Sequence, residues 1–385
     1  MNPLHFAIRA VLTVSLACTF LTAQSQPLRV DGTTPKPEKG QSIMLALLLD
    51  TSNSMDGLID QAKSQLWKIV NELSASRCED GSHPNILISL YEYGNDGLPS
   101  SEGYIRQVVG LTTDLDLISE KLFALRTNGG NEFCGQVIRT SLNQLAWSAS
   151  SADLKLIFIA GNEPFTQGRI GYQQSCALAK EKGVVVNTIF CGNFDEGING
   201  EWKRGADLGG GTYMSIEQDR KTVYVPTPFD DRISQLNDQL NNTYIYYGAS
   251  GESRKEQQQL QDQNAANYSR ANKVDRAVSK SSHAYKNSSW DLVDAARDDE
   301  KIVDKVREEE LPQEMKGMTV EKRKVYVQQK AAERKRIQQE IQTLNQQRQA
   351  YIAEHMPADA AGGQLDAAML RAVREQARLK KLSWK

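Results

Sequence analysis

Several residue types and motifs are scarce or missing from this 385-residue chain. Hydrophobic residues make up 39% of it and its mean hydropathy is -0.52, which argues against a polytopic membrane protein. Lys and Arg total 46 against 48 Asp and Glu, so no excess of positive charge points to a nucleic-acid partner. The sequence has no C-x-x-C pair and its four His residues are scattered, which argues against a Cys/His zinc site.

Motifs of the common α/β enzymes are also missing. No G-x-G-x-x-G follows the first expected strand, and no G-x-x-x-x-G-K-[ST] occurs anywhere in the chain. A hydrolase would need a nucleophile with its base, but His83 is the one His in a loop of the expected α/β domain, and it belongs to the wrong end of the sheet. We therefore expect no enzymatic activity.

The first residues have the order of a secretory signal peptide. An apolar run at residues 10–21 follows His5 and Arg9, and small residues precede a polar stretch at 24–27. The run is about a dozen residues long, shorter than the ~20 that span a bilayer. We expect a signal peptide at residues 1–23, a linker at 24–41, and export to the periplasm, cell envelope or exterior. The alternatives are an uncleaved signal anchor and a lipoprotein signal with a lipid on Cys18.

Residues 42–225 have the pattern of an α/β domain. Short apolar runs predict strands at 43–49, 86–93, 154–160, 184–191 and 212–216, and amphipathic stretches predict helices at 58–73, 115–125, 137–147 and 172–182. Because the strand runs do not alternate with polar residues, they are expected to be buried on both faces, with helices covering a mostly parallel sheet. This predicts a doubly wound α/β fold.

Residues 226–385 differ in composition, with little Gly or Pro and many Gln, Asn, Lys, Glu and Arg. We expect a polar, α-helical C-terminal region with helices at 230–240, 254–296, 300–310, 320–355 and 364–382. A heptad-like spacing typical of a coiled coil links Ile337, Ile341, Leu344 and Tyr351, but Arg334 and Arg348 interrupt the seam and argue against a long one. Loosely packed, solvated helices and a self-associating or partner-binding stalk are the two interpretations.

The first expected strand runs into a D-x-S-x-S loop formed by Asp50, Ser52 and Ser54. Ligands collect at the carboxyl ends of strands in open α/β sheets, because loops and helix N-termini meet there. A carboxylate and two hydroxyls are hard oxygen ligands of the kind that Mg²⁺, Ca²⁺ or Mn²⁺ prefer. A helix N-cap would explain only one of the three residues.

With this loop, residues 43–73 resemble the opening of a von Willebrand factor type A domain and its metal-ion-dependent adhesion site. Later segments agree in order: residues 88–94 are similar to the family's second strand, Gly129-Gly130 to its Gly-Gly loop, and 206–213 to its closing strand. The resemblance covers residues 42–216 and is to exported bacterial members. It implies a doubly wound domain that binds proteins with the help of a metal and has no catalytic activity of its own.

Two segments depart from the family pattern. Asn131, not Thr, follows the Gly-Gly pair, and Gly161 stands where the family usually has Asp. Asn and Glu oxygens in the same loops could replace the missing ligands, so the expected cation site comprises Asp50, Ser52, Ser54, Asn131 and Glu163, with Glu132 in reserve. The alternative is that the site has lost its metal and that Asn131 and Glu163 satisfy loop amides or cap helices.

Four cysteines lie beyond the expected signal peptide. Cys134, Cys176 and Cys191 map near the carboxyl-end rim of the sheet, whereas Cys78 belongs to the opposite end. Because export would bring the chain into an oxidising compartment, we expect at least one disulfide among the three rim cysteines. The alternative is that they are buried thiols that act as small hydrophobic side chains.

These observations predict an exported, non-catalytic module that binds a protein ligand with the help of a divalent cation (Mg²⁺, Ca²⁺ or Mn²⁺). The alternative is a structural or scaffolding envelope protein that acts through its C-terminal helices and whose α/β domain holds no metal. Basic clusters at 322–324 and 334–336 are flanked by acidic residues, and aromatic residues that could stack on bases are almost absent, so they are interpreted as a solvated helix face, not as a nucleic-acid site.

Overall fold

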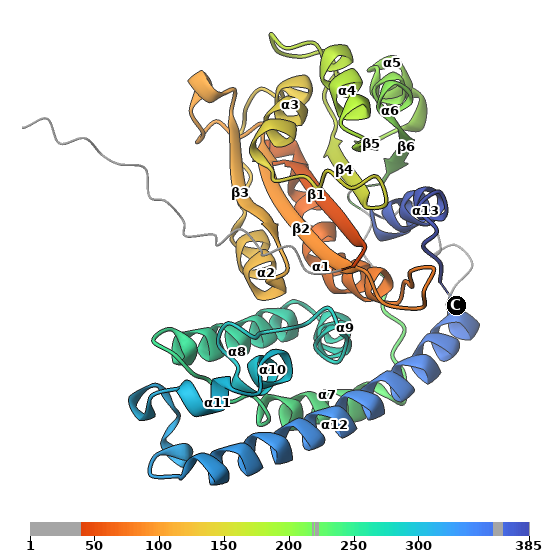
Figure 1. Cartoon of the computed structure of the whole chain (residues 1–385). Helices are drawn as coiled ribbons and strands as arrows, with labels where there is room; N and C mark the ends of the chain where they lie inside the picture. The colour runs from red at the N-terminus through yellow and green to blue at the C-terminus, as the bar shows by residue number, and fades with distance from the viewer. Residues whose placement is uncertain (1–39, 218, 220–222, 357–364, 385) are drawn as a thin grey trace, which may run out of the picture. The chain divides into compact units, whose positions relative to one another are not determined.

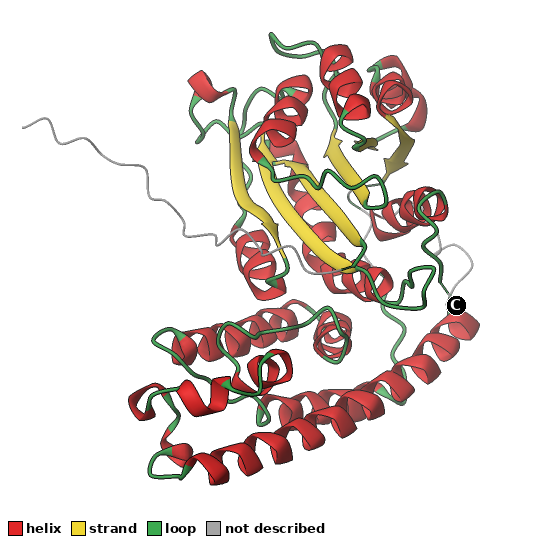
Figure 2. Ribbon diagram, in the orientation of Figure 1, coloured by secondary structure: helices red, strands yellow, loops and turns green. Residues whose placement is uncertain are grey.

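Six strands form a single sheet in the order β3-β2-β1-β4-β5-β6 (Figures 1 and 2). Their bounds are β1 Ser42–Asp50, β2 Asn85–Tyr93, β3 Ile105–Thr112, β4 Leu154–Gly161, β5 Val185–Cys191 and β6 Gly210–Ile216. All neighbouring strands pair in parallel except β2 and β3, which are antiparallel. The predicted doubly wound, mostly parallel α/β fold is confirmed.

This computed structural model describes residues 40–217, 219, 223–356 and 365–384. The predicted signal peptide, the lipidation alternative at Cys18 and nearly all of the predicted linker therefore lie outside the described residues. Among the residues described, no helix is both long enough and apolar enough to cross a membrane.

Alternating side chains of β1 face the two sides of the sheet and contribute to two hydrophobic clusters. Leu45, Leu47 and Leu49 belong to one cluster, and Ala46 and Leu48 to the other. The helices that line the first cluster include α1 Asp56–Ser74, α2 Leu115–Ala124 and α13 Leu365–Arg378, and those that line the second are α3 Cys134–Gln144, α4 Tyr172–Glu181 and α6 Trp202–Gly209. Helices therefore cover both faces of the sheet (Figure 2).

Three elements of this domain were not predicted from the sequence. The edge strand β3 exposes Arg106 and Gln107, and its register on β2 is irregular. The helices α5 Phe194–Asn199 and α6 are short and contain Gly. Neither a short polar edge strand nor a helix of six to eight residues has enough periodicity to be recognised.

The polar region after β6 is helical, as expected, but its long predicted segments are divided. Residues 254–296 form parts of three helices, and residues 300–310 contain only a four-residue helix and a 3-10 turn. The elements are α7 Asp230–Asn241, α8 Gly251–Tyr268, α9 Arg270–Lys280, α10 Leu292–Asp298, α11 Ile302–Lys305 and α12 Val320–His355. Residues of α10, α11 and α12 and of the loops beside them form a third hydrophobic cluster, which includes Ile245, Val293 and Met315.

The helix α12 packs within its own chain, against α7, α9 and α10. Arg334 and Arg348, which interrupt the heptad spacing, are buried in ion pairs with Asp291 and Asp230. The two Arg residues thus dock the helix onto its neighbours, and the interpretation of loosely packed, solvated helices is wrong for this face.

Helix α13 returns to the sheet after the helical excursion. It packs on α1, β4 and β6, and Figure 1 shows it beside them. Gln376 exchanges two hydrogen bonds with the buried Asn187 of β5, with N···O distances of 2.6 and 3.1 Å. The elements α7–α12 therefore lie in sequence between the last strand of the sheet and a helix that covers one of its faces.

Candidate functional site

Asp50 ends β1 at the carboxyl edge of the sheet and is fully buried. Its Oδ1 accepts a hydrogen bond from the backbone N–H of Ser52 at 2.8 Å, but its Oδ2 has no hydrogen-bond partner among the described residues. Burial, reinforced by the charges of Glu132 and Glu163, raises the pKa of Asp50 to about 8. A buried carboxylate oxygen without a donor is costly unless a cation or a proton neutralises it.

The two hydroxyls of the loop lie together beside this carboxylate. Ser52 Oγ and Ser54 Oγ are 3.2 Å apart, and Ser54 also donates to Oδ1 of Asn162 in the loop after β4, at 3.3 Å. Neither Ser52 nor Met55 makes a side-chain capping bond to the following helices. The loop therefore positions its hydroxyls toward the strand ends, and the N-cap explanation does not account for them.

The loop after Gly129-Gly130 brings Glu132 to the site. Glu132 is 4% exposed, whereas its neighbour Asn131 is exposed to solvent. Burial and the charge of Glu163 raise the pKa of Glu132 to about 7. A hydrogen bond from the Ser52 side chain lowers this pKa and offsets part of the rise. The structure thus places the reserve candidate Glu132 next to Asp50, whereas Asn131 is exposed.

Two glycines let the loops close around the Asp50 carboxylate. A Cβ on Gly94, whose φ is +77°, would lie 2.7 Å from Asp50 Oδ1 and 2.9 Å from Cγ of Glu132. A Cβ on Gly161 would lie 2.6 Å from the Tyr93 hydroxyl and 3.1 Å from Asp50 Oδ2. An Asp at position 161, as the family pattern has, would therefore collide with Tyr93.

Glu163, in the loop after β4, is exposed to solvent. Its Oε2 accepts a hydrogen bond from Gln167 at 3.2 Å. No group of three or more His, Cys, Asp and Glu side chains that could hold a metal occurs among the described residues. The groups nearest the end of β1 are instead two buried carboxylates, Asp50 and Glu132, and the two hydroxyls of Ser52 and Ser54. This set of hard oxygen atoms, with one buried carboxylate oxygen unpaired, fits a divalent cation such as Mg²⁺, Ca²⁺ or Mn²⁺.

The expected disulfide is not formed. Cys78, Cys134, Cys176 and Cys191 are free, buried thiols. Cys134 and Cys176 belong to the hydrophobic cluster on one face of the sheet and Cys191 to the cluster on the other, so Cys191 is separated from both. Burial raises the pKa of Cys176 to about 12, and these side chains act as small hydrophobic groups.

An open, doubly wound α/β domain with a D-x-S-x-S loop and a second carboxylate at its carboxyl edge has the features of a von Willebrand factor type A domain. The family model of the von Willebrand factor type A domain matches residues 45–197, less than half of the chain. Such a domain fits a protein-interaction module.

Solved structures with detectable similarity are distant. BatB, a conserved hypothetical protein from Bacteroides thetaiotaomicron, is 16% identical over 46% of this chain and 90% of its own, with a TM-score of 0.35. The pilus adhesin SpaC from Lactobacillus rhamnosus GG is 14% identical over 47% of this chain and 28% of its own, with a TM-score of 0.35. Proximal thread matrix protein 1 from the mussel byssus, with zinc in its MIDAS motif, is 13% identical over 47% and 43%, with a TM-score of 0.33. No curated protein matches the chain.

Proposed function

We propose that this protein is an exported, non-catalytic binding module that holds a protein ligand at the rim around Asp50 with the help of a divalent cation. The observation that carries the proposal is the buried Oδ2 of Asp50, which has no hydrogen-bond partner among the described residues although a second buried carboxyl, Glu132, is close enough to raise its pKa. A bound cation would neutralise both groups.

Asp50 and Glu132 would supply the charge, and Ser52 and Ser54 neutral oxygen atoms. Glu163 and Asn131, on the outer side of the same rim, are available to a partner or to water. A cation held by these few protein groups serves as a Lewis acid that attracts a further oxygen ligand, and an acidic side chain of a protein partner supplies one. Cation and partner would then bind interdependently.

Export is part of the same proposal and rests on the sequence of residues 1–23, which has the order of a signal peptide. The mature chain is proposed to begin between residues 24 and 27. Intact-mass measurement on protein from the native host tests this step independently of the binding site.

Thermal melting of the full chain with millimolar Mg²⁺, Ca²⁺ or Mn²⁺, compared with EDTA, tests the cation. A ligand that binds only the folded state raises the melting midpoint by mass action. Asp50→Ala is expected to remove the rise, whereas Glu196→Gln, which changes an exposed carboxylate on α5, keeps it. Equal responses of wild type and Asp50→Ala to all three ions would refute the cation site.

A further inference from the structure

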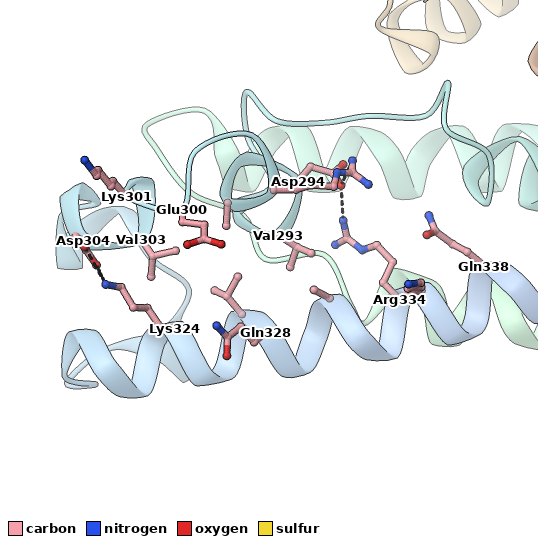
Figure 3. A pocket seen from close by; sticks show the side chains of 15 residues that line it. Val293, Asp294, Glu300, Lys301, Val303, Asp304, Lys324, Gln328, Arg334 and Gln338 are labelled. Carbon is pink, nitrogen blue, oxygen red and sulfur yellow. Dashed lines mark hydrogen bonds and ion pairs between the residues drawn. The ribbon is translucent and has the colours of Figure 1, made fainter. Parts of the chain in front are cut away.

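A cavity of about 780 Å³ lies in the helical region, between α12 and the pair α10 and α11 (Figure 3). Its apolar wall is formed by small and β-branched side chains: Val293, Ala296, Val303, Val327 and Ala331. The volume is within the ~300–1,000 Å³ of typical ligand sites. None of its lining residues belongs to the cluster at Asp50.

The cavity is elongated along α12. The helix contributes residues at three- and four-residue spacings, which place them on one face, and the outermost are Lys324 and Gln338. At 1.5 Å per residue these two positions are about 21 Å apart, which leaves an average cross-section of roughly 37 Å² for the cavity. A whole helix, about 10 Å wide with its side chains, does not fit into this width, but one row of its side chains does.

The charges around the cavity favour an acidic occupant. Asp294 is neutralised by Arg334 and Arg297, each at 3.0 Å, and Asp304 pairs with Lys324 at 2.7 Å. Figure 3 shows two of these pairs, Arg334 with Asp294 and Lys324 with Asp304, on opposite stretches of the groove.

Three charged side chains of the lining remain, and within the described part of the chain they form no ion pair. Lys301 and Lys335 are exposed cations, and Glu300 is the one carboxylate left. The lining as a whole has five basic and three acidic side chains, so its net charge is positive. An apolar stripe flanked by carboxylates complements it.

We propose that this groove docks an amphipathic helix of a partner protein, whose apolar side chains enter between α10–α11 and α12 and whose acidic side chains face Lys301 and Lys335. The apolar residues of such a helix recur every three or four positions, the spacing of the α12 residues that line the groove. This second binding surface is separate from the proposed cation site and shares no residue with it.

The test uses two labelled synthetic helical peptides of about 18 residues, long enough to span the groove. Both have the same Leu and Ala stripe, flanked by Glu in one and by Lys in the other. Fluorescence anisotropy with the full chain in EDTA measures their binding without a contribution from a cation. We expect saturable binding of the Glu peptide, at least about tenfold tighter than that of the Lys peptide.

Two pairs of variants locate the binding. Ala331→Trp fills the groove and is expected to weaken binding about tenfold or more, whereas Ala332→Trp, on an exposed neighbour outside the lining, leaves it unchanged. Lys335→Glu is expected to reduce the preference for the Glu peptide, and Lys322→Glu, at an exposed position outside the lining, to preserve it.

Absence of saturable binding, or Ala331→Trp binding the Glu peptide like wild type, would overturn the proposal. A fluorescent long-chain fatty acid provides the competing probe. If that probe binds, is blocked by Ala331→Trp, and neither peptide binds, the groove holds an acyl chain and the helix proposal is wrong.

Discussion

At the scale of single residues, the cluster at the end of β1 brings together carboxyl groups whose negative charges repel one another. Asp50 and Glu132 are both buried; burial raises the pKa of each, and the charges of Glu132 and Glu163 help to raise that of Asp50. Such a site is stable only with a proton or a cation in it. The stability of the cation-free protein is therefore expected to depend on pH. A neutral side chain at position 50 should remove this dependence.

Asp50→Asn tests this dependence. Burial raises the pKa of Asp50 from 3.8 to about 8, so the folded, cation-free chain retains a proton that the unfolded chain has lost. The contribution of this group to stability is full below pH 4 and is lost as the pH rises through 8. In EDTA at pH 8 to 9, the variant should be more stable than wild type by a few kcal/mol, on the order of the shift. Denaturant titrations at pH 5 and pH 8.5 measure it, and parallel pH profiles of the two proteins would contradict the assignment.

Gly161 departs from the family pattern for a steric reason that can be tested in the same way. A Cβ there approaches the Tyr93 hydroxyl to 2.6 Å, and that hydroxyl is fixed by its hydrogen bond to the carbonyl of Ala160 at 2.9 Å. Gly161→Ala is expected to destabilise the protein by about 1–3 kcal/mol. Gly110→Ala is the control, because its Cβ meets only the flexible end of Gln107, and it should cost much less. Equal unfolding midpoints of the two variants would contradict this reason.

The local part of the site was predictable from the sequence and the remainder was not. Asp50, Ser52 and Ser54 belong to one five-residue loop after a clear strand, so their proximity follows from the motif. The choice between Asn131 and Glu132 depends on the path of the loop after Gly130, whose missing side chain lets the chain pass the carbonyl of Gly94. A difference of one residue in such a loop leaves no periodic signal in the sequence.

At the scale of elements, buried ion pairs fix α12 on the rest of the helical region. Arg334 is 3% exposed and donates to Asp291, Asp294 and Thr243, with its guanidinium 4.0 Å above the ring of Tyr244. In the sequence this Arg only interrupts a heptad pattern. Its Asp partners lie some forty residues away, and no local pattern connects them with it. An Arg at an otherwise apolar seam position was thus misread as a solvated residue.

Arg334→Met leaves the Asp291 carboxylate buried without its partner. Removing one member of a buried pair typically costs ~3–5 kcal/mol, so a large decrease in the free energy of unfolding is expected. Arg336→Met removes an exposed cation two residues further on, whose pair with Glu340 is worth at most ~1 kcal/mol. Chemical denaturation of both variants measures the difference, and a loss in Arg334→Met no larger than in Arg336→Met would show that the pair does not anchor the helix.

At the scale of the whole molecule, the sheet and the helical region share one hydrophobic cluster. It includes residues of β1 and α1 together with Val274 of α9, Ile337 of α12 and Val373 of α13. A fragment that ends at Ile216 would therefore expose the face of α1 that α9 and α13 cover. The sequence indicated two regions of unlike composition, but it contained no sign that the last helix returns to cover the sheet.

Val373→Asp tests whether this shared cluster makes the two regions unfold together. The side chain is fully buried in α13, so a charge there should destabilise the chain by several kcal/mol, whereas Leu379→Asp, at a position 83% exposed, should change little. Because the cluster is continuous, we expect a single calorimetric transition in both proteins, at a lower temperature in Val373→Asp. Hydrogen exchange should accelerate in β1 and in α12 alike. If α12 keeps its protection while β1 loses it, the regions are energetically separate, and the helical groove and the rim around Asp50 bind their partners without influence on each other.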